Sequence, residues 1–489
     1  MNTHPARCPR RARAAVAAGA TVATLIMLAG GAPARAAGAE TGSGAAAAEA
    51  PTATAPAPGQ GSPDAGQDDM RRRIAALERQ LAALKTELER ARTAGEDAEL
   101  EKKIEALSRE VERLRLGAAA PVEAKESIDG LGPAASKVYR SRPGVSIGGY
   151  GEVLYDDPSA TSDDGAPAGG EPGADLLRVV LYFGYKFNDR LLFNSEIELE
   201  HAVAGDGAPG EVAAEFAYVD FRWRPALGVR GGLLLLPVGF LNELHEPPIF
   251  LGARRPDVER FIIPSTWREL GGGVYGGAGP VSWKAYLVTS LDAAGFSAGG
   301  GIRGGRQEGA EVEATDLALT ARLDWVPVQG LLFGASLFTG DTAQGNPGLD
   351  GARVTQWEAH AEWRPRGLQL RALLARTSLD DAAAVSALVG ETIGSQMNGY
   401  YAEAGYNVLA GRKDTAQELM PFVRYESYDT QAEVTRGFAA DPAYDRSVRT
   451  YGVRWRPIPN VAIKADWQDL GNSADTAVDQ FNLALGWLF

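Results

Sequence analysis

The sequence of 489 residues is poor in the side chains that most often carry chemistry, with one cysteine and four histidines. Cys8 lies in a segment that we expect to be removed, so the mature chain has no disulfide, no thiolate metal site and no cysteine nucleophile. His201, His245 and His360 remain, but no G-x-S-x-G motif accompanies them. We therefore expect no enzymatic activity, no metal and no cofactor.

Long apolar runs and positive charge are also scarce. After residue 36 no run approaches the roughly 18 apolar residues of a transmembrane helix. A closed β-barrel is then the only way to cross a bilayer, because the bilayer offers no partners to unpaired backbone groups. The formal net charge is −14, and −19 without residues 1–36 and their five arginines. This acidity argues against nucleic acid as a partner.

The N-terminal region divides into a leader and a linker. Residues 1–36 have a basic start, an apolar run and a small-x-small site at Ala34-Arg35-Ala36. This pattern predicts a secretory signal peptide, with an uncleaved membrane anchor as the alternative. Residues 37–67 are Ala, Pro, Gly, Thr and Ser with almost no large apolar residue, which predicts a disordered linker.

Residues 68–116 carry a heptad pattern that predicts a coiled-coil helix. The apolar seam consists of Met70, Ile74, Leu77, Leu81, Leu84, Leu88 and Ala91, then Leu100, Ile104, Leu107, Val111 and Leu114. The register is lost around Gly95, so the segment is either one long helix with a discontinuity or a helical hairpin. Because one such helix leaves its seam unburied, we expect self-association.

Residues 117–144 contain Gly and Pro and are expected to form a second linker. From Val145 the hydrophobic period changes to two, which is typical of strands. Sixteen strands are predicted, at about 145–155, 176–187, 190–201, 212–224, 227–237, 270–277, 281–290, 315–326, 330–339, 352–364, 367–378, 399–408, 417–429, 447–456, 460–470 and 479–489. The fold class is thus all-β, a 16-stranded antiparallel transmembrane β-barrel over 145–489.

The connections between these strands alternate between short turns and long loops, as in outer-membrane barrels. An even strand number places both barrel ends on the periplasmic side. Several short turns follow a Trp-x-Pro motif, for example Trp325-Val326-Pro327, which suits an interfacial aromatic girdle. The last strand, Phe481 to Phe489, ends on an aromatic residue and resembles the closing strand of such barrels.

Charged residues occupy the even-numbered positions of most predicted strands, between apolar odd-numbered ones. In a barrel of this size the charged face lines a water-filled lumen, whereas in a soluble sandwich it would be the surface. The predicted lumen-lining residues are Arg178, Glu196, Glu198, Asp220, Arg222, Arg322, Glu358, Arg364, Arg424, Arg454 and Lys464.

The longest connection, 238–269, combines large apolar residues such as Phe240 and Phe261 with many charges. Such a loop is expected to pack inside the barrel and narrow the channel, with a surface or subunit-contact loop as the alternative. The predicted pore-constriction residues are Glu243, His245, Glu246, Arg254, Arg255, Asp257, Glu259, Arg260 and Arg268.

Three segments in and around this loop resemble the phosphate-selective porin family. They read P-V-G-F-L-N-E-L-H-E-P-P from Pro237, R-R-P-D-V-E-R from Arg254 and P-S-T-W-R-E-L-G-G-G from Pro264. The resemblance covers 145–489 and implies a sixteen-stranded trimer with an inward third loop and basic residues along an anion path. Selective members place lysines at the constriction, whereas 238–269 contains none. Phosphate as the solute is therefore left open.

We expect an outer-membrane porin for passive diffusion of small hydrophilic or anionic solutes. It would be a homotrimer in contact with outer-membrane lipid, with its coiled coil in the periplasm of a Gram-negative-type bacterium. A structural protein that tethers the envelope through the coiled coil is the first alternative. An outer-membrane hydrolase is a more distant one.

Overall fold

A computed structural model describes residues 128, 130–205, 207–224, 226–412 and 415–489. The signal peptide, the first linker and the coiled coil, predicted over 1–36, 37–67 and 68–116, lie outside the described residues. Among the residues that are described, no helix combines the length and apolarity needed to cross a membrane.

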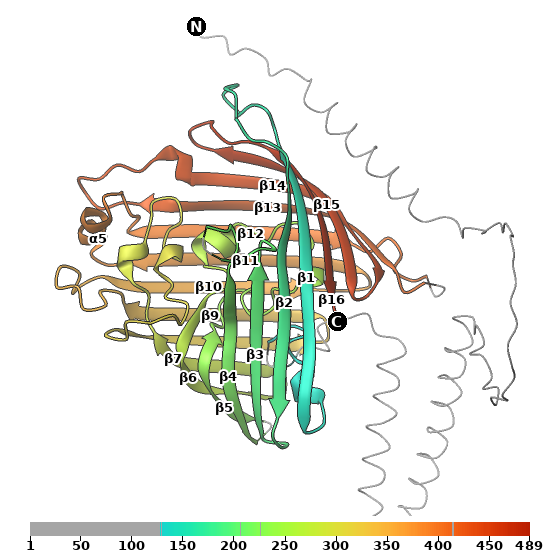
Figure 1. The fold of residues 1–489 in the computed structure, drawn as a ribbon. Helices are drawn as coiled ribbons and strands as arrows, with labels where there is room; N and C mark the ends of the chain where they lie inside the picture. The colour runs from blue at the N-terminus through green and yellow to red at the C-terminus, as the bar shows by residue number, and fades with distance from the viewer. Residues whose placement is uncertain (1–127, 129, 206, 225, 413–414) are drawn as a thin grey trace, which may run out of the picture. The chain divides into compact units, whose positions relative to one another are not determined.

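The described chain forms a closed barrel of sixteen antiparallel strands, which confirms the predicted fold (Figure 1). Each strand pairs with its neighbours in sequence, and β1 pairs with β16 to close the barrel. The strands are β1 (Gly144–Pro158), β2 (Gly173–Lys186), β3 (Leu191–Glu200), β4 (Val212–Arg224), β5 (Leu227–Leu235), β6 (Arg268–Ala278), β7 (Val281–Thr289), β8 (Leu317–Val328), β9 (Leu331–Asp341), β10 (Arg353–Trp363), β11 (Leu368–Leu379), β12 (Gln396–Tyr406), β13 (Glu418–Glu433), β14 (Asp445–Ile458), β15 (Val461–Asn472) and β16 (Gln480–Leu488).

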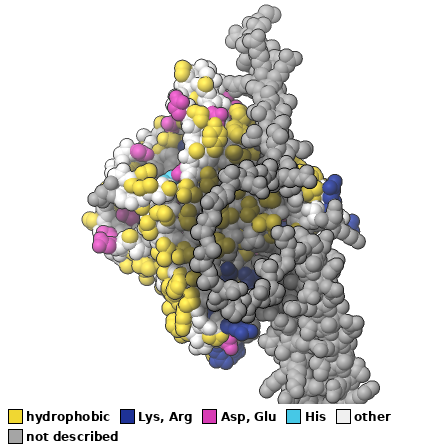
Figure 2. Space-filling model, turned by 45° about the vertical axis from the view of Figure 1, so that its right-hand side comes forward, with side chains coloured by type: hydrophobic (Ala, Val, Ile, Leu, Met, Phe, Trp, Pro, Cys, Tyr) yellow, Lys and Arg dark blue, Asp and Glu magenta, His cyan; other side chains and the backbone are white. Residues whose placement is uncertain are grey.

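The two faces of the strands differ sharply in polarity. Leu181 and Phe183 point outward and are 42% and 38% exposed, whereas Glu196 and Glu198 point inward and are buried. Figure 2 shows hydrophobic side chains over most of the visible strand surface. Because outward apolar and inward charged residues alternate along most strands, the outward face is matched to hydrocarbon and the inward face to polar surroundings.

Short turns join the strands at one end of the barrel, which we call the short-turn end, and longer connections join them at the long-loop end. Trp223, Trp325 and Trp363 lie at the short-turn end, pointing outward and about half exposed. This arrangement is that of an interfacial aromatic girdle.

The loops carry a few short helices. They are α5 (Ala382–Val389), η2 (Pro247–Ile249), η3 (Val258–Ile262), η4 (Ala293–Gly295), η5 (Arg303–Gly305) and η6 (Pro442–Tyr444). The helices η2 and η3 belong to the connection between β5 and β6, which lies inside the barrel. There η3 packs on β11, β12 and β13, and η2 packs on β15 and β16.

The segment before β1 differs from the linker expected over 117–144. Its described part, residues 130–143, contains the short helix α4 (Lys137–Arg140) and lies against the inner wall at the short-turn end. Leu131, Val138 and Tyr139 are buried there. The segment is therefore packed structure. Besides the adjacent β1, it contacts β2 and β3, which lie further along the chain, and no local pattern reveals those contacts.

Candidate functional site

The loop between β5 and β6 crosses the lumen and is attached to the opposite wall. The Nζ of Lys464 donates to the Gly252 carbonyl at 2.9 Å and lies 3.4 Å from the centroid of the Phe250 ring. The Ala253 N–H donates to Asp466 at 2.5 Å. Of the two placements expected for 238–269, the structure thus has the inward one.

Glu243, His245 and Glu259 of the loop are buried in contacts with the wall and with the loop itself. Glu243 accepts from the Nζ of Lys284 at 2.5 Å, and His245 Nε2 lies 3.1 Å from Glu196. Glu259 accepts from the Leu241 N–H at 2.7 Å and from a wall tyrosine, Tyr401. These predicted constriction residues hold the loop in place, because their polar atoms are already used in those contacts.

Glu246 makes its contacts with the segment that precedes β1. Its Oε1 accepts from the Ala134 N–H at 2.9 Å and the Ala135 N–H at 3.1 Å. Burial raises the pKa of Glu246 to about 8, although these two N–H groups act in the opposite direction. The loop and residues 130–143 are therefore joined inside the barrel.

Two of the predicted constriction arginines have carboxylate partners. Arg254 forms an ion pair with Asp156 of β1 at 3.1 Å and donates to Asn482 of β16 at 3.1 Å. Arg268, at the start of β6, pairs with Glu215 at 3.1 Å and with Glu308 at 3.0 Å. Their charges are thus compensated locally.

The remaining predicted constriction residues face the long-loop end. Arg255 donates to the His245 carbonyl at 3.4 Å, and Asp257 accepts from the Tyr428 hydroxyl at 3.1 Å. Arg260 is exposed, with its guanidinium 5.0 Å from the centroid of the Phe261 ring. A cavity of about 440 Å³ opens beside them, with Arg254, Arg260 and Arg446 in its lining.

The predicted lumen-lining residues all lie on the inward face, and the sequence missed several others. Arg371 and Glu403 point inward although their numbers are odd. The reason is the turn after β10, where Trp363 pairs with Leu370, so an odd position shares a face with an even one. Parity returns at β13, where Glu403 pairs with Arg424. Predicting these residues requires the pairing register across each turn, because odd or even numbering alone does not say which face a residue is on.

Arginines cluster in a second cavity, of about 210 Å³, at the short-turn end of the lumen. One side consists of loop and segment residues such as Phe240, Leu244 and Pro133. The opposite side is the barrel wall, which contributes five arginines and two glutamates: Arg322, Arg364, Arg371, Arg454, Arg456, Glu362 and Glu418. We call this space the lower passage.

The lower passage contains two arginine–glutamate–arginine groups. Glu362 pairs with Arg371 at 2.7 Å and with Arg364 at 2.9 Å. Glu418 pairs in the same way with Arg454 and Arg456. Each group has two guanidinium charges for one carboxylate, so each is left with a net positive charge.

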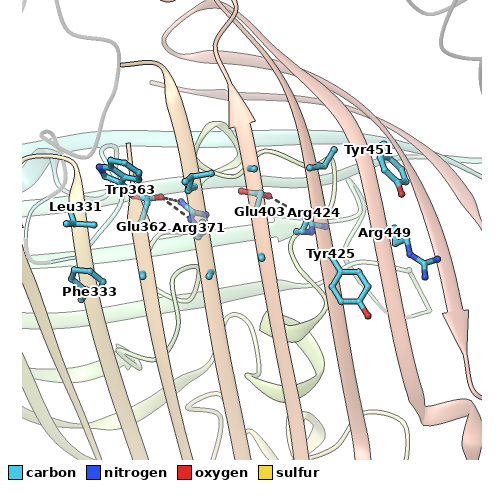
Figure 3. A pocket seen from close by; sticks show the side chains of 16 residues that line it. Leu331, Phe333, Glu362, Trp363, Arg371, Glu403, Arg424, Tyr425, Arg449 and Tyr451 are labelled. Atoms are coloured by element: carbon cyan, nitrogen blue, oxygen red, sulfur yellow. Dashed lines mark hydrogen bonds and ion pairs between the residues drawn. The ribbon is translucent and has the colours of Figure 1, made fainter. Parts of the chain in front are cut away.

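The ion pairs continue around the wall from strand to strand. Figure 3 shows Glu362, Arg371, Glu403 and Arg424 in a row across β10 to β13, with dashed lines between partners. The hollow drawn in that figure, about 710 Å³, lies on the outward face over alanines such as Ala372 and Ala402. It faces away from the lumen and is not part of the lower passage.

Sixteen amphipathic strands closed around a charged lumen define a porin-type barrel. No family model matches the chain. The chain is 39% identical over 396 residues to an uncharacterized protein of Aquifex aeolicus strain VF5, covering 77% of this chain and 87% of that protein. It belongs to the same family as that protein.

Several solved outer-membrane proteins also resemble the chain. Salmonella typhi OmpF with daunomycin has 12% identity and a TM-score of 0.48, over 71% of this chain and 97% of its own. The anion-selective porin of Comamonas acidovorans has 15% identity and a TM-score of 0.42, over 71% and 99%. The DcaP channel of Acinetobacter baumannii has 12% and 0.44, over 71% and 97%. With TM-scores this low, the fold assignment rests on the strand pairing of the chain itself.

Proposed function

We propose that the protein is an outer-membrane porin that lets small hydrophilic solutes diffuse through its lumen, with a preference for anions. The observation that carries this proposal is the pair of arginine–glutamate–arginine groups in the wall of the lower passage, with four arginines against two glutamates. The fifth arginine of that wall, Arg322, pairs with Asp324. Fixed charge at a narrow point discriminates ions more strongly than charge on a wide wall, because screening acts over about 8–10 Å at ordinary salt. Arginine also keeps its charge at any working pH and matches carboxylate and phosphate oxygens.

This proposal moves the selective charges from the loop to the wall. Of the four arginines expected to form the constriction, Arg254 and Arg268 have carboxylate partners, whereas the two wall groups carry excess positive charge. Arg255 and Arg260 lie at the long-loop end, away from the lower passage. The arginines of this wall would attract phosphate, and they would attract carboxylates and sulfate in the same way. A homotrimer in the outer membrane, with residues 68–116 as a periplasmic coiled coil, completes the proposal.

The test is a reversal-potential measurement in planar bilayers under a salt gradient. The variant Arg364→Gln with Arg456→Gln removes one arginine from each group, while Glu362 keeps Arg371 and Glu418 keeps Arg454. We expect the anion-to-cation permeability ratio to fall by up to about fivefold, the equivalent of about 1 kcal/mol for a nearby charge in water. The matched control is Arg353→Gln, whose exposed side chain pairs with Asp341 outside the lumen.

Cation preference in the wild type, or an unchanged ratio in the double variant, would show that these arginines do not set the selectivity. Absence of conductance steps in every variant would overturn the channel itself.

A further inference from the structure

We propose that residues 130–143 form a releasable strap that narrows the short-turn end of the lumen when docked and widens it when released. The inference rests on the proposed channel function. The strap reaches across the bore: α4 packs against β1, β2 and β3, Gly130 lies beside Lys284 of β7, and Pro133 lines the lower passage. A solute that leaves the lower passage therefore meets the strap.

Tyr139 anchors the strap to the wall. Its hydroxyl donates to Asp220 at 2.8 Å, lies 3.0 Å from the Tyr218 hydroxyl and accepts from Arg230 at 3.1 Å. Asp220 and Arg230 are also bonded to each other, at 2.9 Å. The wall pair is thus complete without Tyr139, so release of the strap leaves no isolated charge in the wall.

A second set of contacts fixes the backbone of the strap. The side-chain amide of Asn194 donates to the Ala135 carbonyl at 3.0 Å, and Lys186 donates to the Ser141 carbonyl at 3.0 Å. On its lumen side, the strap donates its Ala134 and Ala135 N–H groups to Glu246 of the loop. All of these are single hydrogen bonds to side chains, and water can replace each of them on release.

The connection between the strap and β1 has the features of a hinge. The strap takes no part in the strand pairing of the barrel, so its release breaks no ladder between strands. It joins β1 at Gly144, whose φ is +126°, a value that favours glycine, and a Cβ there would meet no atom within 4 Å. Gly144 is also the first residue of β1 and pairs with Lys186, so rotation there swings the strap while the pairs from Val145 onward stay in place.

The structure also offers two positions where an introduced disulfide would hold the strap in its docked position. A Cβ built on Gly184 of β2 would lie 2.7 Å from the Val138 Cβ. A disulfide normally places its Cβ atoms about 3.8 Å apart, so the double variant Val138→Cys with Gly184→Cys needs a shift of only about 1 Å. The only cysteine of the sequence is Cys8, in the expected signal peptide, so the mature variant has no competing thiol.

The experiment compares single-channel recordings of the oxidised and reduced double-cysteine protein with those of Tyr139→Ala. The disulfide holds the strap against the wall, so the oxidised protein should show only the smaller conductance of a channel with a docked strap. The larger openings should return when dithiothreitol is added. Tyr139→Ala should raise the conductance, because the strap loses its anchor while Asp220 keeps Arg230. The single-cysteine variants and Tyr451→Ala, an outward tyrosine, are the controls.

The outcomes separate the two proposals. Conductance steps seen only in Tyr139→Ala or in reduced protein would support the strap and would mean that the docked strap closes the lumen completely. Equal conductance and gating in oxidised, reduced and Tyr139→Ala protein would overturn the strap and leave the channel standing. Silence in all of them would overturn both.

Discussion

At the scale of single residues, the ion pair between Lys284 and Glu243 illustrates how the loop depends on the wall. The side chains of both partners are nearly inaccessible, 7% and 3% exposed. Glu243→Gln leaves the ammonium group without its carboxylate, which costs about 3 kcal/mol or more for a buried pair. Asp341→Asn breaks the exposed pair with Arg353 and should cost under about 1 kcal/mol. Equilibrium unfolding of refolded protein in detergent measures both, and equal costs would contradict the buried role of Lys284.

Glu246 gives a pH dependence whose sign follows from its environment. Burial raises its pKa from 4.5 to about 8, although the two N–H groups that Oε1 accepts act to lower it. Its Oε2 is also buried and has no partner among the described residues. A raised pKa means that stability is fully present below the ordinary pKa and is lost as the pH rises through the folded value.

We therefore expect the unfolding free energy of the wild type to fall between about pH 4.5 and pH 8 relative to that of Glu246→Gln. The amide can still accept both N–H bonds but does not titrate. Thermal or denaturant unfolding across this range measures the difference between the two proteins. Parallel curves would mean that Glu246 is ionised at no cost in the folded state.

At the scale of elements, the strands were predictable and the lumen contents were only partly so. Period-two patterns located every strand because each one has lipid on one side and the polar lumen on the other. The inward placement of the loop was also indicated, since Phe240 and Phe261 would be costly in an outer loop. No local pattern indicated the strap, because its stability comes from Asp220, Glu246 and Asn194, which are far away along the chain.

The roles within the loop show the same limit. A charge in a sequence can face the solute or can anchor the backbone, and composition does not distinguish the two. Glu243 and Glu259 are anchors, as their burial against Lys284 and Tyr401 shows. The sequence pattern missed Arg371 for a geometric reason. The turn after β10 pairs an odd position with an even one, so odd-numbered residues point inward in both β11 and β12.

At the scale of the whole molecule, the heptad segment remains a prediction about assembly. Leu81→Glu with Leu107→Glu places charges in the expected seam and should reduce the mass of the full-length protein in detergent. Barrel insertion should continue. Thr86→Glu with Ser108→Glu adds the same charge outside the seam and serves as the control. Sedimentation measures the mass, and unchanged assembly of the seam variant would show that 68–116 does not hold the subunits together.

The contacts of Arg254 have a consequence for how the barrel is completed. Asp156 and Asn482 are direct partners across the β1–β16 boundary, and Arg254 touches both. If the last strand slipped by two residues, these side chains would separate by about 7 Å and one guanidinium could no longer reach both. The contacts of Arg254 therefore favour the one register of β1 and β16 in which both partners are within its reach. A barrel whose loop is fully docked is thus also a barrel closed in the correct register.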